Sequence, residues 1–227
     1  MVQFQNAPHP SQALLYDDPS FPQYRHGLVE ASDTRVHFHR LVETVGAGSL
    51  SIRTTALGAT SPMTRAVGYR PAKHGFAVEA VDGAATGLDF ARREAAAREL
   101  RLSLHQADAD ALPFADESFD YVLSWNVIFH GTMGDVGRRL AEIWRILKPG
   151  ALYQGTMLSR RDAQFRRGRP VAPDTFIRGS DAKAHPHYYC DLAGLAALFA
   201  GFELLSLTQE EQRRPGSWHW HILAERC

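Results

Sequence analysis

Short apolar runs alternate with helical patterns between residues 76 and 158, and this alternation constrains the fold more than any other feature of the sequence. Strands are predicted at Phe76–Val81, Leu102–Gln106, Phe119–Trp125 and Ala151–Leu158. Between them, residues 84–100 and 136–147 repeat apolar side chains at helical spacing. Strands that alternate with helices across short connections are typical of an α/β fold with a parallel sheet.

Boundary residues support the second helical pattern. Asp135 is expected to cap its N-terminus, and Lys148-Pro149-Gly150 is expected to end it. Toward the end of the chain, Asp191 precedes a helical pattern over residues 192–200. We therefore expect a helix on either side of the Ala151–Leu158 strand.

The last part of the chain predicts two consecutive strands. Apolar runs at Phe202–Leu207 and Trp218–Ala224 flank a turn signal over residues 213–217. Two strands joined by a turn suggest an antiparallel hairpin at one edge of the sheet.

Two segments interrupt the regular pattern and suggest the domain organisation. Residues 1–35 have few periodic apolar positions and are interpreted as an N-terminal arm, so that residues 36–227 form the domain. Residues 159–184 break the strand–helix alternation and hold five arginines between Arg160 and Arg169. We expect an exposed insertion there.

Composition narrows the class of protein. Hydrophobic residues make up 44% of the 227 residues, and 25 basic residues balance 25 acidic ones. This balance gives no electrostatic reason to expect a nucleic acid or a membrane surface as partner. No leader-type start and no apolar run of about 18 residues is visible. The two cysteines do not suggest a disulfide framework. We expect a cytoplasmic protein with a small-molecule ligand, and the oligomeric state is left open.

The stretch Gln106–His130 predicts where that ligand lies. Asp108 and Asn126 both lie just past the end of a predicted strand. In open parallel sheets, ligands bind at the carboxyl ends of the strands. This stretch is therefore expected to form one wall of a ligand site.

Three motifs in order resemble a class I S-adenosylmethionine-dependent methyltransferase. They are VEAVDG at residues 78–83, QADADALPFADESFDYVLSWNV at 106–127 and LAEIWRILKPGALYQGTML at 140–158. The similarity extends over roughly residues 74–227. It implies a Rossmann-like, seven-stranded, mostly parallel sheet with helices on both faces and a C-terminal antiparallel hairpin. It also implies S-adenosylmethionine as cofactor and methyl transfer to a small-molecule acceptor.

The resemblance assigns cofactor contacts to particular residues. Asp82 would accept hydrogen bonds from the ribose hydroxyls, and Gly83 would let the backbone approach the sugar. Asp108 and the Ala109 N–H would bind adenine, with Asp110 as the nearby alternative. The methionine moiety would be lined by Ser124, Trp125 and Asn126. Asp82 as a turn residue and Asn126 as a helix cap also have purely structural explanations.

The first motif of the family departs from its pattern in this chain. Family spacing places a glycine-rich loop near residues 60–66, where the sequence contains no glycine. Pro71 interrupts the helix that should follow, and Gly46-Ala47-Gly48 lies too early to replace the loop.

Three explanations of this departure remain open: an irregular loop that still binds the cofactor, a pseudo-enzyme, or an out-of-frame segment over about residues 36–72. A cofactor-free binding or regulatory protein on the same scaffold is the alternative function. An NAD-type oxidoreductase is disfavoured because G-x-G-x-x-G is missing.

Histidine and aromatic residues are the candidate groups for the acceptor. His130 follows the fourth strand of the family pattern and is the candidate general base, although a structural histidine is an alternative. The candidate substrate residues are His185, His187, Tyr188, Trp218 and His219. The HxH pairs at 185–187 and 219–221, with Cys190, have ligand chemistry for a metal. Because the pairs lie far apart in the sequence, no metal site is predicted.

Overall fold

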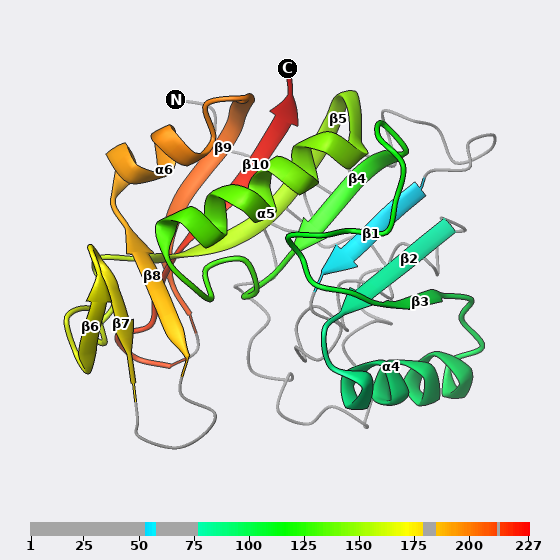
Figure 1. The fold of residues 1–227 in the computed structure, drawn as a ribbon, viewed down its shortest axis with the longest axis horizontal. Coiled ribbons are helices and arrows are strands. Elements are labelled where there is room, and N and C mark those ends of the chain that lie inside the picture. The colour runs from blue at the N-terminus through cyan, green and yellow to red at the C-terminus, as the bar shows by residue number, and fades with distance from the viewer. Residues whose placement is uncertain (1–52, 58–76, 179–184, 213) are drawn as a thin grey trace, which may run out of the picture. The chain divides into compact units, whose positions relative to one another are not determined.

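The computed structural model describes residues 53–57, 77–178, 185–212 and 214–227 (Figure 1). The predicted N-terminal arm, the domain boundary at residue 36 and the first-motif segment near residues 60–66 all lie outside the described residues. Within the described part of the chain, no helix is long and apolar enough to cross a bilayer.

The described residues form one mixed sheet of ten strands with three helices. The helices are α4 (Ala85–Ala97), α5 (Met133–Ile146) and α6 (Leu192–Leu198). The strands are β1 (Arg53–Leu57), β2 (Ala77–Asp82), β3 (Ser103–Gln106), β4 (Phe119–Ser124), β5 (Leu147–Ser159), β6 (Arg169–Ala172), β7 (Thr175–Ile177), β8 (Pro186–Cys190), β9 (Phe202–Glu211) and β10 (Trp218–Arg226).

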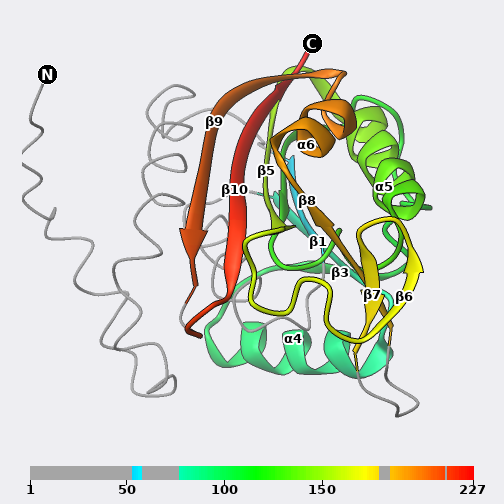
Figure 2. The ribbon, with the colours of Figure 1, turned by 90° about the vertical axis from the view of Figure 1, so that its left-hand side faces the viewer.

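Strands β3, β2, β1, β4 and β5 pair in that order, all in parallel. The crossovers β2–α4–β3 and β4–α5–β5 run in opposite directions away from β1. Because such crossovers are right-handed, α4 and α5 lie on opposite faces of the sheet. Helices α5 and α6 lie together on one side of β5 and β10 (Figure 2).

Strand β5 branches at its carboxyl end. Along most of its length it pairs antiparallel with β10, which in turn pairs antiparallel with β9. At Leu158 and Ser159 it also pairs in parallel with β8, which continues antiparallel to β7 and β6. The C-terminal hairpin and the α/β class are confirmed. The seven-stranded, mostly parallel sheet is not, because β6, β7 and β8 extend it. Residues 159–178 therefore contain strands where the sequence predicted only an exposed insertion.

The main hydrophobic core lies around β4, β5, α5 and α6. Its largest side chains include Phe119, Ile143, Tyr153, Tyr189 and Phe199, none more than 1% exposed. Aromatic contacts link Tyr153 to Phe199, with ring centroids 5.6 Å apart. This packing holds the carboxyl ends of β4 and β5 on a rigid base.

Two predicted boundaries of α5 are wrong. Thr132, not Asp135, is the N-cap residue, and its side chain accepts a hydrogen bond from the Asp135 N–H. The Asp135 carboxylate in turn accepts a hydrogen bond from the Thr132 N–H at 2.6 Å, which completes a capping box. The helix ends at Ile146, and Lys148-Pro149-Gly150 already belongs to β5. The sheet pairing of Leu147 with Phe119 takes over from the helix before the proline is reached.

Candidate active site

The carboxyl ends of β2 and β3 bring the predicted adenosine contacts together. Asp82 ends β2 beside Gln106 at the end of β3, and the Asp82 carbonyl accepts a bond from the Ala107 N–H at 3.2 Å. The Asp82 side chain is buried, and its Oδ1 accepts from the Ala84 N–H at 2.8 Å. This bond orients the carboxylate at the turn that follows β2.

Gly83 and Asp108 form a close pair across these two strands. A Cβ added at Gly83 would lie 3.2 Å from Asp108 Oδ1, so a side chain there would crowd the carboxylate. The alternative residue Asp110 instead lies 3.9 Å from the Arg138 guanidinium. The geometry therefore favours Asp108 over Asp110 as the carboxylate beside Gly83.

Ser124 and Trp125 have buried side chains at the end of β4. Ser124 has no exposed surface, and Trp125 is 3% exposed with its ring edge-on to His221 at 5.0 Å. Strand β4 is covered on both faces, which is why its last side chains pack inward. A ligand at this edge of the sheet can contact these two residues only through their backbone.

Asn126 links four elements at the next position. Its φ of 57° places it in the left-handed region, which few residues other than glycine adopt. Its N–H donates to Thr156 Oγ1 at 2.8 Å, and the Thr156 hydroxyl donates back to Asn126 Oδ1 at 3.0 Å. Its side-chain amide bonds to Gln212 after β9, and its carbonyl is 3.2 Å from His130 Nε2. Asn126 is thus held in a strained conformation by β5, Gln212 and His130.

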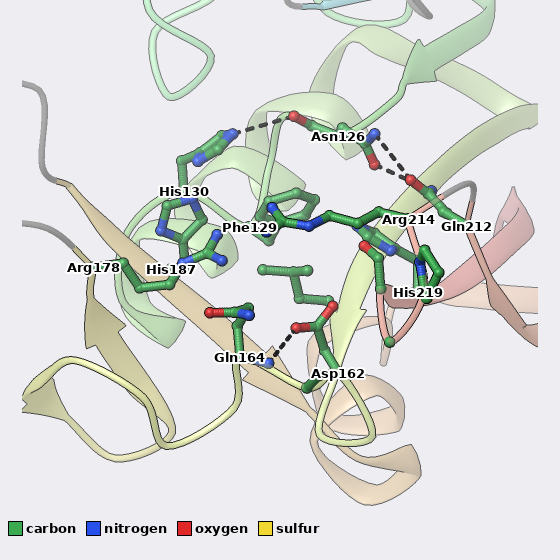
Figure 3. Close-up of a pocket in the computed structure, with 15 residues that line it drawn as sticks. Asn126, Phe129, His130, Asp162, Gln164, Arg178, His187, Gln212, Arg214 and His219 are labelled. Carbon is green, nitrogen blue, oxygen red and sulfur yellow. Dashed lines mark hydrogen bonds between the residues drawn. The ribbon is translucent and has the colours of Figure 1, made fainter.

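A cavity of about 280 Å³ begins at Asn126 (Figure 3). Its walls come from the β4–α5 connection, the end of β5, the segment after β7, the start of β8 and the β9–β10 turn. The polar and aromatic residues that line it are Asn126, Phe129, His130, Asp162, Gln164, Arg178, His187, Gln212, Arg214, Ser217 and His219. Its position next to the β4 carboxyl end is one where open parallel sheets commonly bind ligands.

His130 is the predicted base, and both of its ring nitrogens have partners. Nε2 lies 3.2 Å from the Asn126 carbonyl, and Nδ1 lies 2.9 Å from His185 Nε2. Burial and the neighbouring His185 lower the pKa of His130 to about 4. Burial and the same histidines lower the pKa of His187 to about 3. Both imidazoles are therefore neutral near pH 7.

His219 is the most enclosed histidine of the cavity. It is 5% exposed, and burial followed by the neighbouring His221 lowers its pKa to about 4. Its Nδ1 has no hydrogen-bond partner within the described part of the chain. A buried, neutral nitrogen without a partner is a natural contact for a donor group on a bound ligand.

The charged residues of the cavity were missed by the sequence analysis. Arg178 and Arg214 line it together with the buried carboxylate of Asp162. Both Asp162 oxygens are engaged, Oδ1 by the Gln164 N–H at 2.8 Å and Oδ2 by the Trp218 N–H at 3.1 Å. The arginine-rich run begins close to these cavity residues in the sequence. Its first member, Arg160, does not line the cavity and forms ion pairs with Asp174 and Asp191.

The remaining predicted substrate residues lie around the cavity and do not line it. Tyr188 is 3% exposed in β8, and Trp218 packs under the Arg161 guanidinium at 3.8 Å. His185 is exposed and contacts two residues of the cavity wall, His130 and His187. His187 and His219 are thus the two predicted substrate residues that the structure places in the cavity wall.

Comparisons with known proteins agree with this architecture. Residues 65–150 match the family model described as methyltransferase domain. Demethylmenaquinone methyltransferase of Deinococcus radiodurans is 40% identical over 63 residues, 28% of this chain and 25% of that protein. The uncharacterized protein YafE of Escherichia coli is 45% identical over 75 residues, 33% of this chain and 35% of that protein. The chain spans about a third or less of the length of these relatives.

Solved structures extend the likeness over most of the chain. A Methanosarcina mazei S-adenosylmethionine-dependent methyltransferase has a TM-score of 0.66 at 16% identity, covering 78% of this chain and 94% of its own. A Burkholderia thailandensis 1,6-didemethyltoxoflavin-N1-methyltransferase, solved with S-adenosylhomocysteine, has a TM-score of 0.59 at 17% identity. The match covers 100% of this chain and 93% of that one. The family model over residues 65–150 and the shared fold agree with the resemblance of the three motifs to the class I S-adenosylmethionine-dependent methyltransferases.

The residues present fit the adenosine part of the family's cofactor, S-adenosylmethionine. The buried Asp82 carboxylate ends β2, and the absence of a Cβ at Gly83 leaves the space beside Asp108 open. The Asp82 carboxylate can accept hydrogen bonds from two ribose hydroxyls, and the backbone at Gly83 lets a sugar come close.

The strained conformation of Asn126 predicts a difference between two substitutions. Asn126→Ala and Asn126→Gly both remove the side-chain bonds, but only alanine keeps a Cβ in the left-handed region. We expect Asn126→Ala to be less stable than Asn126→Gly by roughly 1 kcal/mol. Urea unfolding of both variants measures this difference. Equal stability, or a more stable alanine variant, would contradict the strained conformation.

The lowered pKa of His219 predicts acid sensitivity with a definite sign. Below about pH 6.5 the unfolded histidine takes up a proton that the folded one, with a pKa of about 4, does not. Stability is therefore lost as the pH falls. Relative to the wild type, His219→Gln should gain about 2–3 kcal/mol in unfolding free energy between pH 7 and pH 4.5. Urea unfolding at both pH values measures this gain, and a constant difference between the two proteins would contradict it.

Proposed function

We propose that this chain transfers the methyl group of S-adenosylmethionine to a small-molecule acceptor bound in the cavity beside Asn126. The observation that carries the proposal is the position of that cavity, which starts directly beyond the carboxyl end of β4. The sequence resemblance puts the methionine moiety of the cofactor at the same point. A methyl donor and an acceptor would therefore meet at Asn126.

Cofactor binding in this proposal uses the residues predicted from the sequence, with one restriction. Asp82 holds the ribose, Gly83 permits its approach, and Asp108 with the Ala109 N–H holds the adenine. The buried side chains of Ser124 and Trp125 leave only their backbone atoms for the methionine moiety. The cofactor supplies a methyl group activated by a sulfonium, and the protein supplies position.

The acceptor must lose a proton if its nucleophile is a hydroxyl or an amine. We assign the contact with that group to His219, whose buried Nδ1 has no partner among the described residues. His130, the candidate base from the sequence, is engaged through both ring nitrogens. In this proposal His130 positions Asn126 and His185 and does not itself take the proton.

Charge in the cavity suggests the kind of acceptor. Among the described residues that line the cavity, Arg178 and Arg214 outnumber one carboxylate, Asp162, whose oxygens are both occupied by backbone N–H groups. Because the histidines are neutral, the cavity carries an excess of positive charge. A small acceptor with an acidic group fits this wall best. The matched relatives are named for different acceptors, demethylmenaquinone and dimethylglycine among them, and so do not select one.

S-adenosylhomocysteine binding by titration calorimetry tests the cofactor half of the proposal. Asp82→Asn keeps an oxygen for the Ala84 N–H but removes the charge that strengthens the ribose bonds. We expect its affinity to fall about 10- to 100-fold, equivalent to about 1.5–3 kcal/mol. Asp89→Asn is the matched control, because Asp89 is an exposed residue of α4 that pairs with Arg92.

Equal loss in both variants, or unchanged affinity in Asp82→Asn, would contradict the ribose assignment. No binding to the wild-type protein would favour the alternative of a cofactor-free binding or regulatory protein on the same scaffold. We would then attribute the absence of cofactor binding to the unusual first motif.

A further inference from the structure

Three histidines lie close together at the edge of the cavity, and two of them, His130 and His187, line it. One ligating nitrogen each from His130, His185 and His187 lies within 4.8 Å of the other two. They come from two segments far apart in the sequence, the β4–α5 connection and the start of β8. Their imidazole rings are close in space, with centroids 4.5–4.9 Å apart.

Backbone hydrogen bonds hold these two segments in register. The Gly131 N–H donates to the Pro186 carbonyl at 2.8 Å, and the Tyr188 N–H donates to the Phe129 carbonyl at 3.0 Å. His130 and His187 form a β-bridge between those two bonds. The cluster therefore results from paired main chains and does not depend on side-chain rotation alone.

Main-chain carbonyls also select the tautomers of two of the rings. His130 Nε2–H donates to the Asn126 carbonyl at 3.2 Å, which leaves the Nδ1 lone pair facing His185. His187 Nδ1–H donates to the His185 carbonyl at 3.1 Å, which leaves Nε2 as its ligand atom. Histidines that ligate metals are typically oriented by such a bond from the second ring nitrogen to a carbonyl.

We propose that His130, His185 and His187 form a binding site for a divalent transition metal ion of the zinc type. Two imidazole nitrogens on one tetrahedral zinc ion lie about 3.3 Å apart. His130 Nδ1 and His185 Nε2 are already 2.9 Å apart, and a small rotation of the exposed His185 ring would open this distance. Three histidines leave the fourth position of the metal open, as in catalytic zinc sites.

The charges around the three histidines indicate which kind of fourth ligand the metal ion would take. Arg139 donates to the Ile128 carbonyl at 3.0 Å, and Arg178 lines the same cavity as His130 and His187. These positive charges oppose a bound cation. An anionic fourth ligand offsets this opposition, and His130 and His187 both line the acceptor cavity. A deprotonated oxygen or sulfur of the acceptor could take that position, and the metal would lower its pKa.

The metal site itself stands independently of the proposed methyl transfer, and only the identity of the fourth ligand rests on it. The test is zinc titration of the metal-free full chain by calorimetry, with the visible spectrum of bound Co²⁺ as the report on tetrahedral geometry. We expect the wild-type chain to bind one equivalent of zinc at this site. His185→Ala and His187→Ala should each weaken that binding at least tenfold. His185→Ala is the safer variant, because the side chain is exposed.

His105→Ala is the matched control, since His105 pairs with Glu79 in β2 and lies outside the cavity. It should leave the zinc affinity unchanged. Absence of zinc binding to the wild-type chain, or binding that His185→Ala and His187→Ala do not weaken, would overturn the proposal. S-adenosylhomocysteine binding to the same variants is measured in parallel, so that failure of the metal site and failure of the cofactor site are told apart.

Discussion

The site depends on the paired hydrogen bonds between Asn126 and Thr156. The N–H of Asn126 donates to the threonine hydroxyl, which donates back to the asparagine side chain. This closed pair holds Asn126 in the left-handed region and turns the chain sharply as it leaves β4. His130 and Gln212 also contact Asn126, so the carboxyl end of β4 and the cavity share one support.

Branching of β5 explains why a cavity exists next to that support. Near Leu158 the strand pairs with β10 on one side and with β8 on the other. Leu158 lines the cavity at this branch, together with residues 162–164 and the β9–β10 turn. Strand β8 brings His187 to this space and β10 brings His219. The strands added to the parallel part of the sheet thus give the cavity a histidine-rich wall.

Much of the architecture could be predicted because its signals are local. Strands β2, β4, β5 and β10 are long apolar runs, and Asp191 caps α6 as expected. Strand β8 was missed because Pro186 and two histidines precede its buried residues, so no alternation is visible. The capping residue of α5 was assigned to Asp135 because a carboxylate suits both the N-cap and the third helical position.

The site was predictable only where it follows strand ends. Asp82, Asp108 and Asn126 could be placed because parallel strands bring their carboxyl ends to one edge. The cavity charges could not, since Arg178 and Arg214 reach it from connections whose paths depend on β7, β8 and β10. Inward packing of Ser124 and Trp125 likewise depends on strands on both sides of β4.

The central claim is that a cofactor crevice and an acceptor cavity meet at Asn126. A crystal structure of the chain with S-adenosylhomocysteine tests it most directly. The account predicts the ribose on the Asp82 carboxylate, the adenine beside Asp108, and the sulfur directed past Asn126 toward the cavity between His187 and His219. A ligand seated elsewhere, or a sulfur directed away from that cavity, would contradict it.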